Sequence, residues 1–304
     1  MARPLQKIKN DLIYYATRIL IVFLGLLPFS WMRPLGQTFG FVIFSLAGGE
    51  RRKTIASLQT AYPDELATKE LERLARSVWI GLGWNLFEVV QWIHVPHERL
   101  VSMVARESGA ENLDKALQRG KGALVLTAHL GNWELLGAWL SNRHTTTAVA
   151  QNLYDPRFDS MVTGLRTNNI KVPMIKRGIA LRAILENLKK NHIVIAVVDQ
   201  DTGKDGVFVP FFNKPAWTQS GSARIALKTG AALVPAFMVR GADGRFEVHV
   251  EPEIEVPRTG DDEKDVTETV RRYTTVVETY VKAFPNQWMW MHQRWKTRPQ
   301  EEKA

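Results

Sequence analysis

The chain of 304 residues contains no cysteine. This absence excludes disulfide bonds, thiolate catalysis, and zinc or iron–sulfur sites that depend on cysteine ligands. The sequence also lacks the phosphate-loop pattern G-x-x-x-x-G-K-[ST], a convincing G-x-G-x-x-G fingerprint and the G-x-S-x-G nucleophile motif. His94 and His97 have a spacing seen in metal sites, but Pro96 lies between them and no third ligand is near in sequence. We therefore expect no metal, no nucleotide cofactor and no activated serine.

Long uncharged apolar runs are missing as well, although the N-terminal segment is the most apolar part of the chain. Arg18 interrupts the run from Leu12 to Phe29, and the uncharged stretch Ile19–Met32 has only 14 residues, fewer than the roughly 20 that a spanning helix needs. We predict that residues 1–50 form a membrane anchor, as one tilted helix whose Arg18 reaches towards the headgroups. A re-entrant or interfacial hairpin, a buried core helix and a cleaved signal peptide are the alternatives.

Basic residues outnumber acidic ones, with a formal net charge of +9 and a sequence pI near 9.7. The first 60 positions hold eight basic residues against two acidic ones, interleaved with apolar sequence. Nucleic-acid-binding proteins seldom combine these features, so we expect an anionic membrane surface, and no nucleic acid, as a partner. The ten tryptophans agree with this prediction, because tryptophan favours membrane–water interfaces as well as protein cores.

The pattern of apolar residues changes along the rest of the chain. Apolar positions three and four residues apart predict one long helix over Thr68–Trp92, which Pro96 ends. Beyond Gly120, short apolar runs alternate with amphipathic stretches, which indicates an α/β fold with a mixed, largely parallel central sheet flanked by helices. Strands are expected near 122–128, 146–150, 192–198, 232–239 and 245–251, and helices near 133–140, 157–168, 178–190, 219–229 and 264–284. We divide the chain into the anchor over 1–50, a helical segment over 51–110, an α/β domain over 111–299 and a polar tail over 300–304.

Chemically capable side chains follow two of the predicted strands. His129 ends the apolar run 123–128, and Glu134 comes five residues later at the start of a predicted helix. Imidazole titrates near neutral pH and a carboxylate can fix its tautomer, so the pair suits removal of a proton from a hydroxyl group. The structural alternative is a histidine with a packing role only, and an acid that favours a helix N-terminus beside the N-cap Asn132. Asp199-Gln200-Asp201 ends another strand, and ligands of open α/β sheets gather at such ends.

The loops after these strands offer further polar groups. The backbone N–H groups of Gly131 and Asn132 lie at a predicted helix N-terminus, where we expect them to face a developing oxyanion or a phosphate. Asp199 and Asp201 either line an acceptor pocket, hold His129 by a second hydrogen bond, or make Asx-type turns with no further role.

Four blocks of the sequence follow a known order. The segment Thr127–Glu134, which reads TAHLGNWE, resembles the signature of the late lipid A acyltransferases, the lauroyl and myristoyl transferases of Gram-negative inner membranes. The other blocks are Asp199-Gln200-Asp201 followed by Val207–Phe212, Ala216 and Thr218; Gly230–Pro235; and Phe284–Pro299, which is similar to the closing motif of that family. The resemblance covers nearly the whole chain, including its apolar N-terminus.

The resemblance implies transfer of a fatty acyl group from acyl carrier protein to a hydroxyl of a lipid acceptor, at the cytoplasmic face of the inner membrane. In lipid A synthesis this hydroxyl belongs to a 3-hydroxyacyl chain on the glucosamine disaccharide. His129 would then be the general base that deprotonates the hydroxyl, and Glu134 would orient and charge-balance the imidazole. The residues implied to bind substrate are Asn132, Arg166, Asp199, Gln200, Asp201 and Arg294.

The roles of the two arginines each have a structural alternative. Arg166 is expected to contact a phosphate or an oxyanion, and its alternative is an arginine on a helix surface. Arg294, with Lys296 and Arg298, forms a basic cluster among tryptophans that suits lipid headgroups or the acidic carrier protein. Its alternative is a packed C-terminal tail.

One position departs from the family pattern. Where many members carry arginine before an Asn-x-x-Tyr/Phe-Asp segment, this chain has Gln151. Arginine is the usual bidentate phosphate ligand, so its absence leaves a different polar lipid open as the acceptor, with acyl-CoA as an alternative donor. A non-catalytic basic membrane-surface protein is the alternative outside the enzymes.

Overall fold

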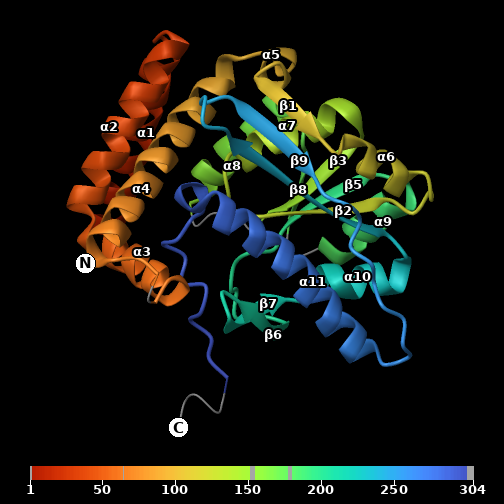
Figure 1. The fold of residues 1–304 in the computed structure, drawn as a ribbon. Coiled ribbons are helices and arrows are strands. Elements are labelled where there is room, and N and C mark those ends of the chain that lie inside the picture. Colours follow the sequence, from red (N-terminus) through yellow and green to blue (C-terminus); the bar gives the residue numbers. More distant parts are fainter. Residues whose placement is uncertain (1, 64, 151–154, 177–179, 300–304) are drawn as a thin grey trace.

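A seven-stranded sheet forms the centre of the protein (Figure 1). The structure is a computed structural model that describes residues 2–63, 65–150, 155–176 and 180–299. The strands lie in the order β1-β9-β8-β2-β5-β3-β4, and neighbours run parallel apart from β8 and β9. Their bounds are β1 Val104–Ser108, β2 Ala123–Thr127, β3 Thr146–Ala150, β4 Met174–Lys176, β5 Ile193–Val197, β8 Ala232–Arg240 and β9 Phe246–Val250. The predicted α/β fold with a mixed, largely parallel sheet is confirmed.

Helices cover both faces of this sheet, which explains why its central strands are apolar runs without alternation. All five residues of β2 are buried, as is typical of parallel strands with two covered faces. One hydrophobic cluster joins the sheet to α6 and α7, and a second joins its other face to α9, α10 and α11. These helices and their neighbours are α5 His97–Val101, α6 Ala110–Leu117, α7 Trp133–Arg143, α8 Pro156–Gly164, the π-turn Leu165–Asn169, α9 Ala180–Lys189, α10 Gly221–Thr229 and α11 Asp262–Ala283.

The first four helices of the chain stack beside the sheet (Figure 1): α1 Ala2–Gly25, α2 Met32–Leu46, α3 Gly48–Ala61 and α4 Thr68–Gln91. The helix predicted over Thr68–Trp92 is confirmed as α4. Glycines let α2 and α4 approach closely, since a Cβ at Gly40 would lie 2.1 Å from the Trp79 carbonyl oxygen and one at Gly83 2.2 Å from that of Gly36. The short helices Phe29–Trp31 and Trp92–His94 follow α1 and α4.

The N-terminal helices differ from the anchor that the sequence predicts. Within the described residues, no helix combines the length and the apolarity that crossing a bilayer requires. The reason lies in the sequence of each helix, because α1 carries four basic residues and Asp11, while α2 has only 15 residues. The predicted spanning helix is therefore not supported.

A two-stranded hairpin was not expected from the sequence. It consists of β6 Gly206–Phe211 and β7 Lys214–Gln219, and its turn residues Phe212 and Asn213 have φ values of 51° and 57°. Positive φ at both central positions matches the twist of a tight hairpin. The aromatic ring of Phe212 is buried, and its N–H donates to Glu278 of α11 at 2.8 Å, which holds this residue in its unusual conformation. Prolines within both strands hid the hairpin from a reading of the sequence.

Candidate active site

The imidazole of His129 lies at the carboxyl end of β2, where the chain turns sharply into α7. Gly131 makes this turn with a φ of 61°, and a Cβ there would lie 1.9 Å from the carbonyl oxygen of Met238. No other residue fits, since the backbone conformation and the close approach both require glycine. The turn therefore fixes the position of His129 just beyond the edge of the sheet.

The buried carboxylate of Asp199, at the end of β5, holds His129 twice. The ring nitrogen Nδ1 lies 2.9 Å from Oδ1 of Asp199, and the backbone N–H of His129 donates to Oδ2 at 2.9 Å. The indole N–H of Trp288 donates to the same Oδ2 at 2.7 Å. Since Asp199 is 3% exposed, these partners replace the water that an ionised carboxylate would otherwise need.

The two groups shift the pKa of each other. Burial disfavours the charge of Asp199, but the charge of His129 and the hydrogen bonds outweigh it and lower the pKa of the carboxyl. Burial also disfavours the imidazolium, but the Asp199 carboxylate outweighs it and raises the pKa of His129 above its ordinary value. Asp199 is therefore the ionised partner that keeps a proton on Nδ1.

Glu134, expected to orient the imidazole, makes a different contact. In the first turn of α7 it pairs with the guanidinium of Arg166 from the π-turn, whose Nε lies 3.0 and 3.1 Å from its two carboxylate oxygens and whose Nη2 also contacts it. The structure thus places Asp199, and not Glu134, at Nδ1 of His129. The cause is the start of α7, which carries the Glu134 side chain round to the pocket wall beside Arg166.

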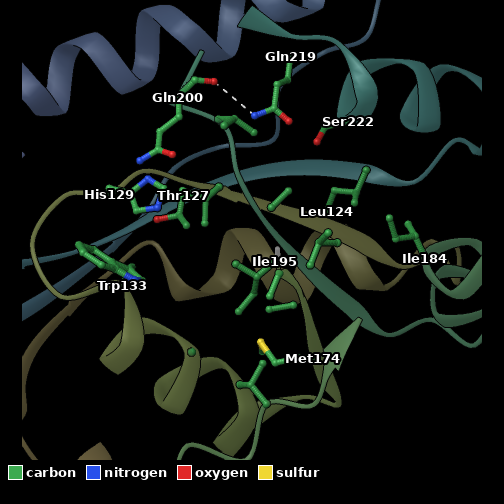
Figure 2. A pocket seen from close by; sticks show the side chains of 18 of the residues that line it. Leu124, Thr127, His129, Trp133, Met174, Ile184, Ile195, Gln200, Gln219 and Ser222 are labelled. Atoms are coloured by element: carbon green, nitrogen blue, oxygen red, sulfur yellow. Dashed lines mark hydrogen bonds between the residues drawn. The ribbon is translucent and has the colours of Figure 1, made fainter. Parts of the chain in front are cut away.

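A pocket of about 430 Å³ opens beside these groups (Figure 2). His129, Glu134, Arg166 and Gln200 line it, which brings together four of the predicted site residues. Most of the remaining wall is hydrocarbon from β2, β3, β5, α7, α9 and α10. The imidazole of His129 thus stands at the edge of a mostly apolar pocket.

The other predicted residues have structural roles in this structure. Asn132 caps α7 by accepting from Leu135 N–H at 3.1 Å, while Gly131 and Asn132 donate their N–H groups to the carbonyls of Gln287 and Met238. The sequence predicted that these two N–H groups face an oxyanion or a phosphate, but both already donate to backbone carbonyls. Asp201 accepts from Gly203 N–H and Thr297 N–H, at 2.8 and 2.9 Å, so it is a turn carboxylate away from the pocket.

The structure also corrects the substrate-binding role predicted for Arg294. Its guanidinium is buried, donates to the carbonyl of Trp217 at 2.7 Å and to Thr218 Oγ1, and lies over the ring of Phe211. Burial lowers its pKa to about 10. Arg294 therefore holds the C-terminal tail against the β6–β7 hairpin, in agreement with the alternative prediction of a packed C-terminal tail. Gln151 lies outside the described residues.

Sequence reasoning missed two tryptophans at the site. The ring of Trp133 meets that of His129 edge to face, with centroids 5.2 Å apart, and Trp133 lines the pocket (Figure 2). Trp288 fixes Asp199 through its indole N–H. Both belong to the sequence blocks that carry the family resemblance, which is the one signal that could have marked them.

A histidine held by a buried aspartate at a strand end thus stands beside a mostly apolar pocket. The profile of the bacterial lipid A biosynthesis acyltransferases matches residues 4–297, and the chain belongs to this family. It is an acyltransferase.

Curated relatives fall into two groups by the acceptor in their names. A phosphatidylinositol mannoside acyltransferase of Mycobacterium tuberculosis (strain ATCC 25618 / H37Rv) is 28% identical over 264 residues, which cover 83% of this chain and 79% of that protein. The lipid A biosynthesis palmitoleoyltransferase of Escherichia coli (strain K12) is 29% identical over 258 residues, 82% of this chain and 80% of the relative. The lipid A biosynthesis lauroyltransferase of the same strain is 25% identical over 278 residues, with coverage of 90% and 88%. All three names describe acyl transfer in glycolipid synthesis.

Proposed function

We propose that the protein transfers a fatty acyl group from acyl carrier protein to a hydroxyl of a lipid A precursor, with His129 as the general base. The observation that carries this proposal is the hydrogen bond between Asp199 and Nδ1, because it leaves Nε2 as the ring nitrogen that meets a substrate in the pocket. The carboxylate stabilises the imidazolium that forms when Nε2 accepts a proton.

The reaction needs only one proton carrier. Nε2 of His129 takes the hydroxyl proton as the acceptor oxygen attacks the thioester carbonyl carbon. The tetrahedral intermediate then collapses, the carbon–sulfur bond breaks, and the imidazolium returns the proton to the leaving thiolate. The products are an ester and a free thiol, and the histidine is again neutral. The raised pKa of His129 favours the first proton transfer.

The ion pair of Glu134 and Arg166 faces the same pocket and has a positioning role in this proposal. Its charges balance locally, so it lines the wall without leaving a bare carboxylate beside the reacting atoms. The guanidinium is part-buried with a raised pKa, since the bonds and charge of Glu134 outweigh its burial. A fixed cation at this place suits an acceptor with a phosphate group.

The N-terminal helices offer a surface for a membrane-bound acceptor. Exposed apolar side chains crowd α1, α2 and the turn between them, namely Leu12, Ile19, Val22, Phe23, Leu26, Trp31, Phe41 and Leu46. Exposed basic residues lie beside them, namely Arg18 on α1, Arg33 on α2 and Arg52 on the following helix α3. This combination favours docking on the anionic cytoplasmic face of the inner membrane through helices that lie in the interface.

A second candidate acceptor follows from the relatives that act on phosphatidylinositol mannosides, which are as similar to this chain as the lipid A enzymes. Purified protein, acyl carrier protein loaded with a labelled chain and each glycolipid in turn test the choice by mass spectrometry of the extracted lipids. We expect one added acyl chain on the lipid A precursor. A mass shift on the mannolipid alone would favour the second candidate.

The role of the histidine is tested with His129→Ala, which we expect to abolish transfer. His144→Ala is the matched control, because His144 forms a second histidine–aspartate pair, with Asp114 at 3.1 Å, away from the pocket. Full activity in His129→Ala would contradict the proposed mechanism.

A further inference from the structure

The pocket occupies a gap in the sheet between β3 and β5. These strands pair from Thr146 to Ala148, the last of which lies opposite Ile195. Beyond this point β3 pairs only with β4, as far as Ala150 opposite Lys176. The strands therefore separate towards their carboxyl ends, and the pocket reaches both faces of the sheet there. We call the parts on the two faces the α7 arm and the α10 arm.

The α7 arm has walls mostly of hydrocarbon and one thioether, and the Glu134–Arg166 ion pair borders it, with Nη1 of Arg166 3.9 Å from Sδ of Met174. Its lining residues are Gly137, Ala148, Ile170, Val172, Met174 and Ile195. Figure 2 shows Met174 and Ile195 on this side, below the sheet and beyond Trp133. A polymethylene chain gains from burial in such a space, and the charged groups at its border are paired with each other.

The α10 arm is different, because polar side chains accompany its apolar floor of Leu124, Ile184 and Ile225. Gln219 and Ser222 line this part of the pocket (Figure 2), and Thr202, two residues after Gln200, also lines the pocket. The hydroxyl of Thr202 is buried without a hydrogen-bond partner among the described residues. A buried hydroxyl in this state calls for a polar ligand group, so this arm suits the amide- or hydroxyl-bearing part of a substrate.

The absence of a side chain at Gly137 leaves space in the α7 arm. This glycine follows Trp133 by one helical turn, so both residues lie on the same side of α7 and Gly137 lies deeper in the pocket. A Cβ at this position would lie 3.4 Å from Cγ2 of Ile170 and 3.4 Å from Cγ2 of Val172. A methyl group therefore fits at contact distance, whereas a longer side chain has to extend into the arm.

We infer that the α7 arm holds the acyl chain of the donor, and that Gly137 is the residue that determines how long this chain may be. The inference rests on the proposed acyl transfer and adds to it the part of the site that selects the donor. A glycine at this place leaves the arm open for a long chain, and each added side-chain carbon shortens the chain that fits.

The test compares Gly137→Ala and Gly137→Met with Gly221→Met and Gly49→Met. Gly221 lines the α10 arm and an added Cβ there meets nothing within 4 Å, so its variant places the same side chain in the other arm. Gly49, on α3, also has open space around an added Cβ and lies outside the pocket, so its variant controls for the substitution itself. Alanine in place of a mid-helix glycine favours the helix, which protects the fold of Gly137→Ala.

The measurement is kcat/KM for octanoyl, lauroyl, myristoyl and palmitoyl carrier protein. In Gly137→Met we expect the longest chain that the wild type accepts to lose roughly 5- to 150-fold, the factor that corresponds to about 1–3 kcal/mol of overpacking. Octanoyl transfer should change little, and Gly137→Ala should move the optimum in the same direction by less. An unchanged length profile in Gly137→Met, or the same change in Gly221→Met, would overturn the inference.

Binding separates this inference from the proposed reaction. The affinity of each variant for free fatty acids of graded length is measured by displacement of a fluorescent fatty acid, which needs no catalysis. If Gly137→Met prefers shorter fatty acids than the wild type, the inference is supported. A failure to acylate any acceptor would defeat only the proposed function. Equal affinities of wild type and Gly137→Met for every length would defeat the inference alone.

Discussion

Replacing Asp199 by asparagine removes one charge and leaves the volume of the side chain unchanged. The asparagine oxygen can still accept from the backbone N–H of His129 and from the Trp288 indole. The amide NH2 group then takes the place of the oxygen that contacts Nδ1 of His129, so two donors face each other. If that NH2 group faces Nδ1, the ring nitrogen must accept, and the ring proton moves to Nε2. The imidazole then presents a proton, and not a lone pair, to the acceptor hydroxyl.

The size of the effect follows from the role of the base. General base catalysis contributes about 10²- to 10⁴-fold, and Asp199→Asn removes both the tautomer and the charge that support it. We therefore expect kcat to fall by a factor in this range, roughly 3–5 kcal/mol of activation free energy. The KM for the donor should change much less, because Asp199 is not among the pocket-lining residues.

The pH profile gives a second readout of the same substitution. His129 must be neutral to accept a proton, and Asp199 raises its pKa above the ordinary 6.5. Wild-type kcat/KM should thus rise with pH through a pKa above 6.5, and in Asp199→Asn the acidic limb should move to lower pH because the stabilising charge is gone. Rates of transfer from labelled acyl carrier protein, measured across pH, show both effects.

Asp201→Asn is the matched control for this experiment. Asp201 is a buried carboxylate two residues along the same loop, and it accepts from backbone N–H groups only, as far as the described residues show. We expect Asp201→Asn to lower the free energy of unfolding by about 1–3 kcal/mol, because one hydrogen-bond acceptor is lost. The acidic limb of its pH–rate profile should stay where it is in the wild type. The reasoning is refuted if Asp199→Asn retains wild-type kcat, or if its acidic limb stays where it is.

Three further predictions concern other parts of the molecule. Glu134→Gln releases Arg166 from its carboxylate partner, and we expect a loss of kcat smaller than that of Asp199→Asn, with an acidic limb at lower pH because one negative charge near His129 is removed; the transfer assay across pH checks this. Arg240→Met leaves the carboxylate of Glu88, whose side chain is 4% exposed, without its cationic partner, and should destabilise the fold by about 3–5 kcal/mol, as measured by urea unfolding. Ile19→Asp places a charge on a 71% exposed side chain of α1 and should weaken binding to phosphatidylglycerol vesicles roughly tenfold or more, since a buried isoleucine is worth about 1.5–3 kcal/mol; unchanged sedimentation with vesicles would contradict the proposed docking surface.

The sequence predicts the strands of the site and the residues that end them, but not which carboxylate meets the histidine. Thr127 of β2 lies opposite Val197 of β5, so His129 and Asp199 each stand two residues beyond a paired position. They meet because β5 lies beside β2 in the sheet, and that order is decided by long-range packing that periodicity does not report. Glu134 is nearer in sequence, but it belongs to a helix whose first turn directs it elsewhere.

The C-terminal motif shows a second limit of sequence reasoning. Arg294 stands among tryptophans and basic residues, which is the pattern of a membrane-facing surface. In the fold the same tryptophans pack round the hairpin turn, and Arg294 donates to the hairpin from a buried position. The charge pattern alone does not separate these cases, because a buried arginine and an exposed one have the same letter in the sequence.

The two carboxylates near His129 differ in their partners, since Glu134 pairs with Arg166 and Asp199 contacts the imidazole itself. Both Asp199 and Glu134 raise the pKa of the imidazole, and Arg166 lowers it. Each uncompensated carboxylate favours the imidazolium, and a protonated imidazole is no base. Pairing Glu134 with Arg166 limits this effect, because the positive charge of Arg166 lowers the pKa of His129. In the proposed mechanism the arginine thus supports catalysis through the charge balance of the site, in addition to any contact with the substrate.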